Sequence, residues 1–424
     1  MELTRTRQEA SSGEGCALHD GFRSVRAATL SLVAGLGPED LGAQSMADAS
    51  PGKWHLAHTT WFLDAVVLGA APGCRPIRPE WHVLFNSYYE ALGPRHPRPQ
   101  RGLLTRPTLE QVLAYRREVD DAVATALAAD RLPPAALALL ELGIEHEQQH
   151  QELLVTDLKH LFAQNPLRPA LRPREPRANA ATPACRWLEF PDEGAVEIGA
   201  PASGFAFDNE RPRHRHWLRP FAIASRPVTN ADFAEFVADG GYLDPRWWLS
   251  DGWATVQSER WEAPLYWQRD GDGWLAFTAQ GLLPLAPAEP ACHLSHYEAD
   301  AYARWAGARL PTEFEWEHAL GTKPWTGGFA DAGLLHPGEL AAESVGGDVW
   351  EWTSSAYLPY PGFVPLAGAA GEYNGKFMSG QLVLRGASCA TPRRHARASY
   401  RNFFPPAARW QFSGLRLARD LEPR

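Results

Sequence analysis

LLELGIEHEQQHQEL, residues 139–153, is the stretch that decides the fold of the first part of the chain. On an α-helix, residues three and four apart share a face. One face of this stretch combines apolar and polar side chains, namely Leu139, Leu142, His146, Gln149, His150 and Leu153. We expect that face to be buried, where an unpartnered polar group costs roughly 1 to 3 kcal/mol. Histidines at positions i and i+4 bring two ring nitrogens to one point. The pattern therefore predicts a metal site, with core histidines satisfied by carbonyls or water as the alternative.

A second helical segment, residues 54–68, repeats this anomaly. Its apolar face consists of Trp54, Ala57, His58, Trp61, Phe62 and Ala65. His58 therefore occupies a core position. Three imidazoles directed into one bundle predict a metal site with open coordination positions and the ligands His58, His146 and His150. His55, on a different face, is the rival third ligand. An all-nitrogen site suits zinc for hydrolysis or ferrous iron for oxygen chemistry, and the pattern does not choose between them.

The periodicity of the rest of the chain predicts its domain organisation. Residues 20–164 show helical periodicity near 22–36, 54–68, 108–129 and 135–162, which predicts a four-helix bundle. The polar residues 1–19 predict a flexible tail, and the Pro, Arg and Ala-rich residues 165–186 predict a linker. From residue 187 to 424, short apolar runs are broken by Gly, Pro, Asn and Asp. This pattern predicts a loop-rich α+β domain with brief helices around 230–237 and 297–307.

Composition and charge exclude several classes of protein. At 424 residues the chain can form two domains with a sizeable core. A formal charge of −9 does not indicate general binding to nucleic acid or to acidic membranes. No run of apolar residues approaches the roughly 18 that indicate a transmembrane helix. The five cysteines lack CxxC spacing, so neither a disulfide framework nor a sulfur-rich metal site is expected. Without a secretory signal, we expect a soluble, cytoplasmic protein; no pattern indicates an oligomeric state.

The connection between the second and third predicted helices carries a second group of candidate residues, in the sequence FNSYYEALGPRHPRPQRGLLT, residues 85–105. Tyr88 or Tyr89 offers a phenol that could donate a proton or hydrogen atom, with an interface tyrosine pair as the alternative. Arginines recur at every third position, at Arg95, Arg98 and Arg101. The prolines between them favour an extended, polyproline-like course that aligns the three side chains. Such a row could clamp a carboxylate, or it could be a solvated basic strip.

The C-terminal stretch SYRNFFPPAARWQFSGLRLARD crowds aromatic side chains around Asn402. The rings are Tyr400, Phe403, Phe404, Trp410 and Phe412. Aromatic faces can hold a quaternary ammonium group by cation–π attraction. Packing of the last strands is the alternative reading.

Eight motifs that follow one another along the chain indicate a protein family more specifically than any one of them does alone. They are SPGKWHLAHTTWF, FNSYYEALGPRHPRPQRGLL, EHEQQHQELL, PVTNADFAEFV, ARLPTEFEWEHAL, GGDVWEWTSS, VLRGAS and RNFFPPAARWQFSGLRLARD. Together, from about residue 20 to 420, they resemble the iron-dependent sulfoxide synthases of ergothioneine biosynthesis. The resemblance implies an α+β multidomain protein. Its DinB-like four-helix bundle is followed, at residues 187–424, by a domain similar to the formylglycine-generating enzyme, with a C-type-lectin-like fold.

The resemblance also implies a reaction. Members of that family are non-haem iron enzymes that use O₂ and Fe(II) to join a thiol to C2 of the imidazole of hercynine (Nα-trimethylhistidine), forming a sulfoxide. The implied iron ligands are His58, His146 and His150, the three histidines that the helical faces select. Gln149 would face hercynine, Asn402 would fix its amino-acid end, and Arg98 and Arg101 would hold the carboxylate of the thiol. Phe403 and Phe404, which follow Asn402, are further candidates for substrate binding.

One departure bears on the thiol donor. Family members that use γ-glutamylcysteine tend to carry an acidic residue at the position of Phe404, so the resemblance favours the branch that uses free cysteine. That branch takes its active-site tyrosine from the helical domain, which fits Tyr88 or Tyr89. The partners expected are small molecules, without nucleic acid or membrane. The alternatives are γ-glutamylcysteine as donor, an ovothiol-type synthase that uses histidine, a DinB-type metal-dependent thiol transferase that needs no O₂, and a non-catalytic binding module.

Overall fold

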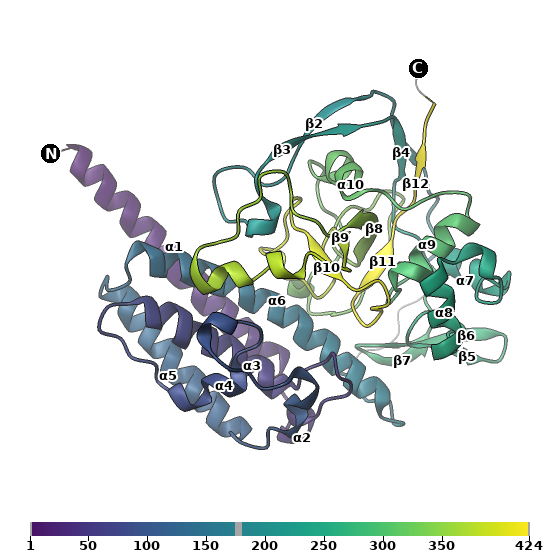
Figure 1. The fold of residues 1–424 in the computed structure, drawn as a ribbon. Coiled ribbons are helices and arrows are strands. Elements are labelled where there is room, and N and C mark those ends of the chain that lie inside the picture. Colours follow the sequence, from purple (N-terminus) through teal and green to yellow (C-terminus); the bar gives the residue numbers. More distant parts are fainter. Residues whose placement is uncertain (1, 174–179, 423–424) are drawn as a thin grey trace. The chain divides into compact units, whose positions relative to one another are not determined.

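The computed structural model describes residues 2–173 and 180–422, with only the backbone of residues 2–16. The chain divides into two compact units, Met1–Leu161 and Phe162–Arg424. The first unit is helical and the second combines strands and helices, so the predicted order of the two fold types is confirmed (Figure 1). The predicted linker, residues 165–186, contains neither helix nor strand in its described parts. Its residues 174–179 lie outside the described residues.

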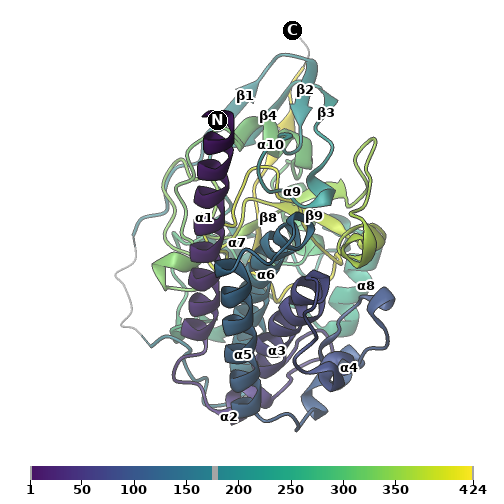
Figure 2. The same ribbon diagram turned by 90° about the vertical axis from the view of Figure 1, so that its left-hand side faces the viewer.

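The first unit is a bundle whose long helices lie alongside one another (Figures 1 and 2). These helices are α1 (Glu2–Leu32), α3 (Gly52–Phe62), α5 (Leu109–Ala128) and α6 (Pro134–Gln164). A π-helical turn, Leu63–Val67, and a 3₁₀ turn, Leu68–Ala70, continue α3, and the short helices are α2 (Pro38–Gly42) and α4 (His82–Phe85). Helix α1 begins at Glu2, inside the segment for which the sequence predicts a flexible tail. The polar composition of this segment favoured the tail, but the structure gives its backbone a helical conformation.

A buried ionic network joins the helices of the bundle. Glu147 on α6 accepts hydrogen bonds from Arg26 Nη1 on α1 at 2.8 Å and from Thr29 Oγ1 at 2.6 Å. It also pairs with Arg116 on α5. Arg26 in turn donates from Nη2 to Thr60 Oγ1 on α3 at 3.0 Å. All five residues are buried, so one carboxylate satisfies cations from two other helices in a place where an unpaired charge would be very costly.

Helix α6 is buried on more than the single face that the sequence predicts. Of the predicted face, Leu142 and His146 are buried, whereas Leu139, Gln149, His150 and Leu153 are half-buried. Every residue from 142 to 148 is buried, including the polar Glu147 and Gln148. The prediction of one buried face is therefore wrong. Glu147 lies outside the predicted face, and from the sequence alone its carboxylate would be expected in solvent, because its arginine partners are distant in the sequence.

The connection after α3 is more regular than its sequence indicates. The extended, polyproline-like course predicted around the arginines is wrong, because Arg98–Leu103 forms a 3₁₀ helix. Pro97 is the N-cap of this helix and a second proline occupies its first turn, where a missing backbone N–H breaks no helical hydrogen bond. Buried Asp64 anchors the beginning of the connection by accepting hydrogen bonds from Ile77 N at 2.9 Å and Tyr115 Oη at 2.8 Å.

The second unit contains small sheets (Figure 1). The largest has the order β10-β9-β8-β11, in which β11 pairs with β8 in parallel and the other pairs are antiparallel. Its strands are β8 (Trp350–Ala356), β9 (Leu382–Arg385), β10 (Asn402–Phe404) and β11 (Ser413–Leu415). A second sheet has the order β1-β4-β12, with β1 (Trp187–Phe190), β4 (Phe221–Ala224) and β12 (Ala418–Asp420). The others are a hairpin, β2 (Gly194–Ile198) with β3 (His214–Leu218), and a meander of β5 (Trp267–Asp270), β6 (Gly273–Thr278) and β7 (Gly281–Pro284).

The helices of the second unit include two that the sequence predicts and two that it misses. The predicted pair appears as α7 (Asn230–Ala238) and α9 (His296–Trp305). The other two are α8 (Ser250–Glu259) and α10 (Glu313–Leu320). Helix α10 starts with a capping box in which Thr312 and Glu315 bond each other's backbone N–H groups. The T-x-x-E spacing was therefore an available signal for this helix.

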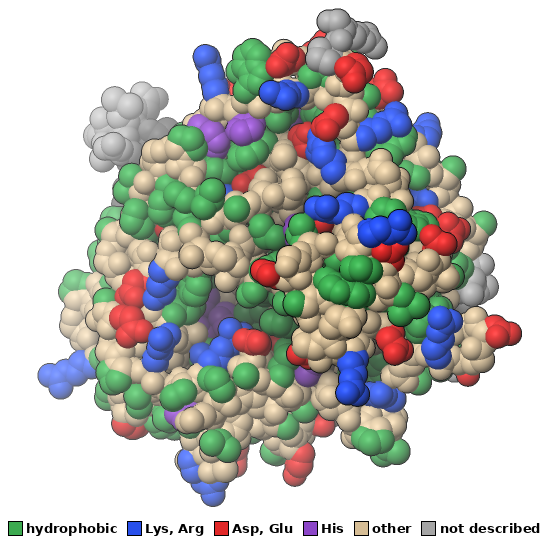
Figure 3. Space-filling model, turned by 45° about the vertical axis from the view of Figure 1, so that its right-hand side comes forward, with side chains coloured by type: hydrophobic (Ala, Val, Ile, Leu, Met, Phe, Trp, Pro, Cys, Tyr) green, Lys and Arg blue, Asp and Glu red, His purple; other side chains and the backbone are tan. Residues whose placement is uncertain are grey.

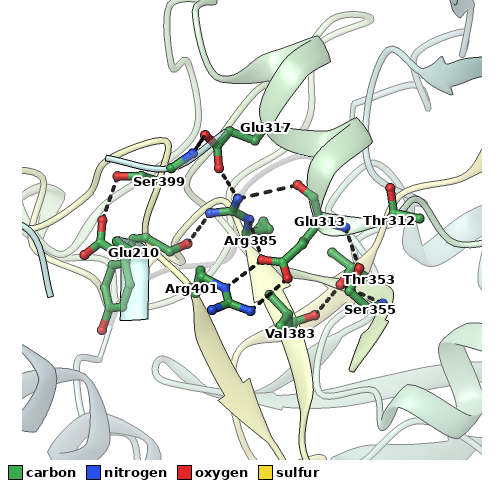
Figure 4. Close-up of polar contacts among 12 residues, drawn as sticks. Glu210, Thr312, Glu313, Glu317, Thr353, Ser355, Val383, Arg385, Ser399 and Arg401 are labelled. Carbon is green, nitrogen blue, oxygen red and sulfur yellow. Dashed lines mark hydrogen bonds and ion pairs between the residues drawn. The ribbon is translucent and has the colours of Figure 1, made fainter. Parts of the chain in front are cut away.

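A buried cluster of ion pairs holds the strand that carries Asn402 (Figure 4). Glu313, at the start of α10, accepts hydrogen bonds from Arg401 Nε at 2.8 Å and Nη2 at 2.9 Å. Arg385 on β9 pairs with Glu317 on α10 and donates from Nη1 to the carbonyl oxygen of Tyr400 at 3.0 Å. Because Arg401 directly precedes β10, these buried pairs fix the backbone from which the Asn402 side chain extends.

The described surface carries scattered charge. The face drawn in Figure 3 shows acidic and basic side chains in small, mixed groups, in keeping with a modest net charge of −9. None of the described helices combines the length and the apolar character that crossing a bilayer requires.

Candidate functional site

Three histidines of the bundle converge as the helical faces predict. His58 on α3 and His146 and His150 on α6 each offer a nitrogen, and these nitrogens all lie within 4.8 Å of one another. The Nε2 atoms of His58 and His146 are 3.2 Å apart. Two nitrogens bound at about 2.1 Å to one metal lie about 3.0 Å apart at adjacent octahedral corners and about 3.4 Å apart in a tetrahedron. The spacing between the nitrogens of His58 and His146 therefore fits a shared ion of either geometry.

The nitrogen that His58 presents is set by a backbone contact. Its Nδ1 lies 2.6 Å from the carbonyl oxygen of Phe85, which can only accept a hydrogen bond. The ring proton is therefore on Nδ1, and the lone pair of Nε2 faces His146. Trp54 stacks on the ring of His58 with centroids 4.5 Å apart, and Trp61 stacks on it at 5.5 Å. His58 is thus held in both tautomer and orientation.

The three imidazoles are neutral at neutral pH. Burial lowers the pKa of His58 well below its usual value, and burial lowers that of His146 to about 3. His150 is half-buried as a residue, but its ring packs against those of His58 and His146, and desolvation there lowers its pKa well below the usual value. Metal binding requires neutral imidazole, so the bundle prepares all three for that role.

Arg101 is a buried cation beside these histidines. Its Cζ lies 3.4 Å from the ring centroid of Trp54, the residue that stacks on His58. Its guanidinium donates to Ser50 Oγ at 2.9 Å and Ser87 Oγ at 3.1 Å. Among the described residues no carboxylate pairs with it, and burial lowers its pKa to about 8. A buried guanidinium whose partners, in the part of the chain that the structure describes, are hydroxyls and an aromatic face is suited to receive an anionic ligand.

The other two arginines of the predicted row lie in different surroundings. Arg98 is exposed and donates to the carbonyl oxygen of Asp48. Arg95 pairs with Glu90 at 3.1 Å and donates to the carbonyl oxygen of Ser87 at 3.1 Å. The alternative of a solvated basic strip therefore describes Arg95 and Arg98, whereas Arg101 stands apart. Joint carboxylate binding by Arg98 and Arg101 stays a prediction.

Tyr88 and Tyr89 lie in a tight turn near the histidines. Asn86, which is buried, shapes the turn by donating from Nδ2 to the carbonyl oxygen of Tyr89 at 2.9 Å and accepting from Tyr89 N at 3.1 Å. The ring of Tyr89 is buried and lies 5.8 Å from that of Trp61, which also stacks on His58. Tyr88 is half-buried and stacks on Tyr89 at 4.6 Å. Tyr89 is thus one aromatic ring away from the histidine cluster.

His55, the rival third ligand, does not belong to the cluster. Its Nδ1 lies 2.9 Å from Nδ1 of His150, and its Nε2 lies 2.9 Å from Oδ2 of Asp157. The cluster found among the described residues consists of His58, His146 and His150. Sequence reasoning missed Asp157, although it stands seven residues after His150 and therefore on the same face of α6 two turns later.

The candidate substrate residues of the second unit lie on β10. Asn402 is half-buried, and its Oδ1 accepts a hydrogen bond from Phe403 N at 2.9 Å. Phe403 stacks on Tyr357 with centroids 4.0 Å apart, and Phe404 approaches Trp410 edge-on at 6.3 Å. Gln149, the remaining candidate, is half-buried on α6 of the first unit. The roles of these residues stay predictions.

Comparisons with known proteins agree with this architecture. Residues 22–154 match the DinB superfamily, and residues 178–333 and 328–421 match the sulfatase-modifying factor enzyme 1-like domain. These matches confirm the predicted fold class.

Curated relatives extend the comparison over both units. The chain is 34% identical to the hercynine oxygenase of Mycolicibacterium thermoresistibile, over 88% of each chain. It is also 34% identical to the hercynine oxygenase of Mycobacterium tuberculosis, over 94% of this chain and 97% of the relative. A match to ergothioneine biosynthesis protein 1 of Schizosaccharomyces pombe is 26% identical and covers 55% of this chain and 30% of that protein. The resemblance that the eight motifs carry is thereby confirmed, and the chain belongs to the hercynine oxygenase family.

Proposed function

We propose that this protein is a non-haem iron sulfoxide synthase that joins cysteine to C2 of the imidazole of hercynine in ergothioneine biosynthesis. The observation that carries the proposal is the convergence of three neutral imidazoles on one point inside the bundle. Membership of the hercynine oxygenase family supports hercynine as the substrate. The reaction balances without a further reductant. The thiol S–H and the C2–H bond break, the carbon–sulfur bond forms, and O₂ accepts four electrons to give the sulfoxide oxygen and one water.

His58, His146 and His150 would hold the iron. Ferrous iron, when bound, supplies one-electron chemistry toward dioxygen and makes a thiol more acidic. The bundle's part is to keep the three imidazoles neutral and in place, which the Phe85 carbonyl and the Trp54 ring do for His58.

The proposed substrate-binding residues form two groups, one for the carboxylate of cysteine and one for hercynine. Arg101 would bind the carboxylate of cysteine, because its buried guanidinium has hydroxyl and aromatic partners but no carboxylate among the described residues. Gln149 and Asn402 would bind hercynine, with Phe403 and Phe404 beside its trimethylammonium group. An aromatic ring at Phe404 offers no charge to a glutamyl ammonium, which favours cysteine over γ-glutamylcysteine as donor.

Replacing Arg101 by leucine is expected to raise the KM for cysteine by about 10- to 100-fold, because a hydrogen bond to a charged group contributes about 1.5 to 3 kcal/mol. Arg98→Leu is the comparison that shows whether Arg98 shares this carboxylate. Its guanidinium is exposed and bonds a backbone carbonyl, so we expect a smaller rise in KM. Initial rates over a range of cysteine concentrations at saturating hercynine measure both. Equal KM values for cysteine in the two variants would mean that both arginines bind the cysteine carboxylate or that neither does. Either result would contradict a separate role for Arg101.

Removing the phenol that serves the reaction is expected to divert product from hercynylcysteine sulfoxide to cysteine sulfinate, because thiol oxidation competes once the proton or hydrogen-atom donor is lost. We expect the larger diversion for Tyr89→Phe, since Tyr89 is buried against Trp61, which packs on His58. The ratio of the two products by mass spectrometry measures the effect. Unchanged ratios in both Tyr88→Phe and Tyr89→Phe would remove the tyrosines from the mechanism.

The proposal as a whole is tested by anaerobic reconstitution with Fe(II), followed by mass analysis after air is admitted. Hercynine is paired in turn with cysteine and γ-glutamylcysteine, and histidine replaces hercynine in a third reaction. We expect hercynylcysteine sulfoxide from the first pair at a rate well above the other two. A preference for γ-glutamylcysteine would correct the donor, a preference for histidine would indicate the ovothiol-type reaction, and thiol transfer under strict anoxia would overturn the proposal.

A further inference from the structure

A chain of polar contacts leads from His150 to a buried carboxylate. His150 Nδ1 lies 2.9 Å from His55 Nδ1, and His55 Nε2 lies 2.9 Å from Asp157 Oδ2. The same Asp157 oxygen accepts a hydrogen bond from the backbone N–H of Ser50 at 2.7 Å. Ser50, His55 and Asp157 are each no more than 5% exposed, so water does not compete for these contacts.

The proton positions in this chain follow from its carboxylate end. An ionised carboxylate only accepts hydrogen bonds, so His55 must carry a proton on Nε2. With His55 neutral, its lone pair is on Nδ1, and in that state the contact at 2.9 Å is satisfied when His150 donates from its own Nδ1. Neutral His150 is left with its lone pair on Nε2. Asp157 thus determines, through one intervening ring, which nitrogen of His150 is available to a metal.

The helices and the ring of Trp54 hold His55 and His150 in the orientations that these contacts need. Asp157 and His150 lie on the same rigid helix, α6, while His55 lies on α3 one turn before His58. Trp54 meets the rings of both His55 and His150, at centroid distances of 5.8 and 6.2 Å, which limits rotation of either ring. His58 reaches the same tautomer by a different device, the carbonyl of Phe85. Separate supports therefore give both rings the same tautomer.

We infer that His55 and Asp157 are positioning residues that hold His150 as its Nδ1–H tautomer, so that Nε2 faces the centre formed with His58 and His146. The inference rests on the proposed function in assigning a metal to that centre. It adds that two residues outside the ligand set control metal affinity, and that His55 acts as a relay and not as a ligand. Loss of an outer partner of this kind typically weakens metal binding by about 10- to 100-fold.

The test uses the full chain, with Co²⁺ alone as the metal probe and its visible absorption as the readout. We expect His55→Phe and Asp157→Leu to weaken Co²⁺ binding by about 10- to 100-fold. Asp157→Asn is the conservative rescue: its carbonyl oxygen can replace Oδ2 and accept from both Ser50 N and His55 Nε2, so the loss should be less than about 10-fold. Thr156→Val is the control, because the hydroxyl of this buried neighbour donates to the Leu153 carbonyl at 2.9 Å and, among the described residues, takes no part in the relay.

A second readout needs no metal. Long-range proton–nitrogen correlation of metal-free protein labelled with ¹⁵N-histidine, assigned with His150→Gln, reports the tautomer of His150. We expect Nδ1–H in the parent, in Asp157→Asn and in Thr156→Val, and a shift toward Nε2–H in His55→Phe. Unchanged tautomer and Co²⁺ affinity in His55→Phe, or equal losses in Asp157→Asn and Asp157→Leu, would overturn the inference. Failure of the parent to bind Co²⁺ would instead count against the proposed metal centre, while the tautomer measurement would still decide the relay.

Discussion

Replacing His58 by leucine is expected to abolish Fe(II) retention and reduce sulfoxide formation to background. His58 is fully buried, and its Nε2 lies 3.2 Å from that of His146, so the substitution removes one of the three nitrogens that converge in the bundle. The loss of metal affinity should exceed the 10- to 100-fold range expected for residues that only support a ligand. Equilibrium dialysis with Fe(II) under anoxia, followed by the product assay, measures both effects.

The fold of the His58→Leu variant should survive. Leucine fills a similar volume, and the main cost is the carbonyl of buried Phe85 left without its hydrogen-bond partner, about 1 to 3 kcal/mol. His160→Leu is the matched control, because His160 is a half-buried histidine of α6 whose Nδ1 bonds Ser45 Oγ at 2.7 Å. Full iron retention by His58→Leu, or equal loss in His160→Leu, would show that the three histidines do not form the metal site.

Replacing Glu147 by leucine is expected to have the largest effect on stability. The substitution removes the carboxylate that Arg26 and Arg116 share, and breaking a buried ion pair from one side costs about 3 to 5 kcal/mol. Arg26 keeps its contact with Asp120 at 2.6 Å, so the uncompensated charge is mainly that of Arg116. Urea unfolding of the full chain, followed by far-ultraviolet circular dichroism, measures the free energy of unfolding of the helical unit.

The double variant Glu147→Leu with Arg116→Met is the control for this prediction. It removes both members of the pair, and such replacements by apolar residues are often neutral or stabilising. We expect it to be more stable than Glu147→Leu alone. If the double variant is less stable than the single one, Arg116 contributes chiefly through its contacts with Thr59 Oγ1 and the Arg26 carbonyl, and the ion pair is not the main term.

Lowering the pH should remove the stabilisation that the ion pairs of Glu147 provide. Although burial alone would raise the pKa of Glu147, Arg116 and Arg26 lower it to about 2, from a usual value of 4.5. Because the folded pKa lies below the unfolded one, the contribution is fully present above about pH 4.5 and is lost as the pH falls toward 2. The pH dependence of unfolding between these values should be shallower in Glu147→Leu than in the parent protein.

Local periodicity accounts for most of what the sequence alone determines about this protein. The bundle helices, the i and i+4 pair His146 and His150, and the core position of His58 all follow from a repeat of 3.6 residues, which involves only near neighbours along the chain. The family likeness of the eight motifs adds the order of the two domains. These features depend on short spacings, and short spacings are readable without coordinates.

Contacts between distant residues were decided only by the tertiary structure. His55 and Asp157 are 102 residues apart, so the relay has no spacing that a sequence pattern can express. The helical faces predict that His58 and His146 share one site, but their 3.2 Å approach across 88 residues is set by the packing of the helices. The burial of Arg101 beside exposed Arg98 likewise depends on which side of one 3₁₀ helix meets Trp54. The tautomer of His58 depends on where the backbone carbonyl of Phe85 lies. Every residue carries such a carbonyl, and only the packing of helices decides which one meets an imidazole.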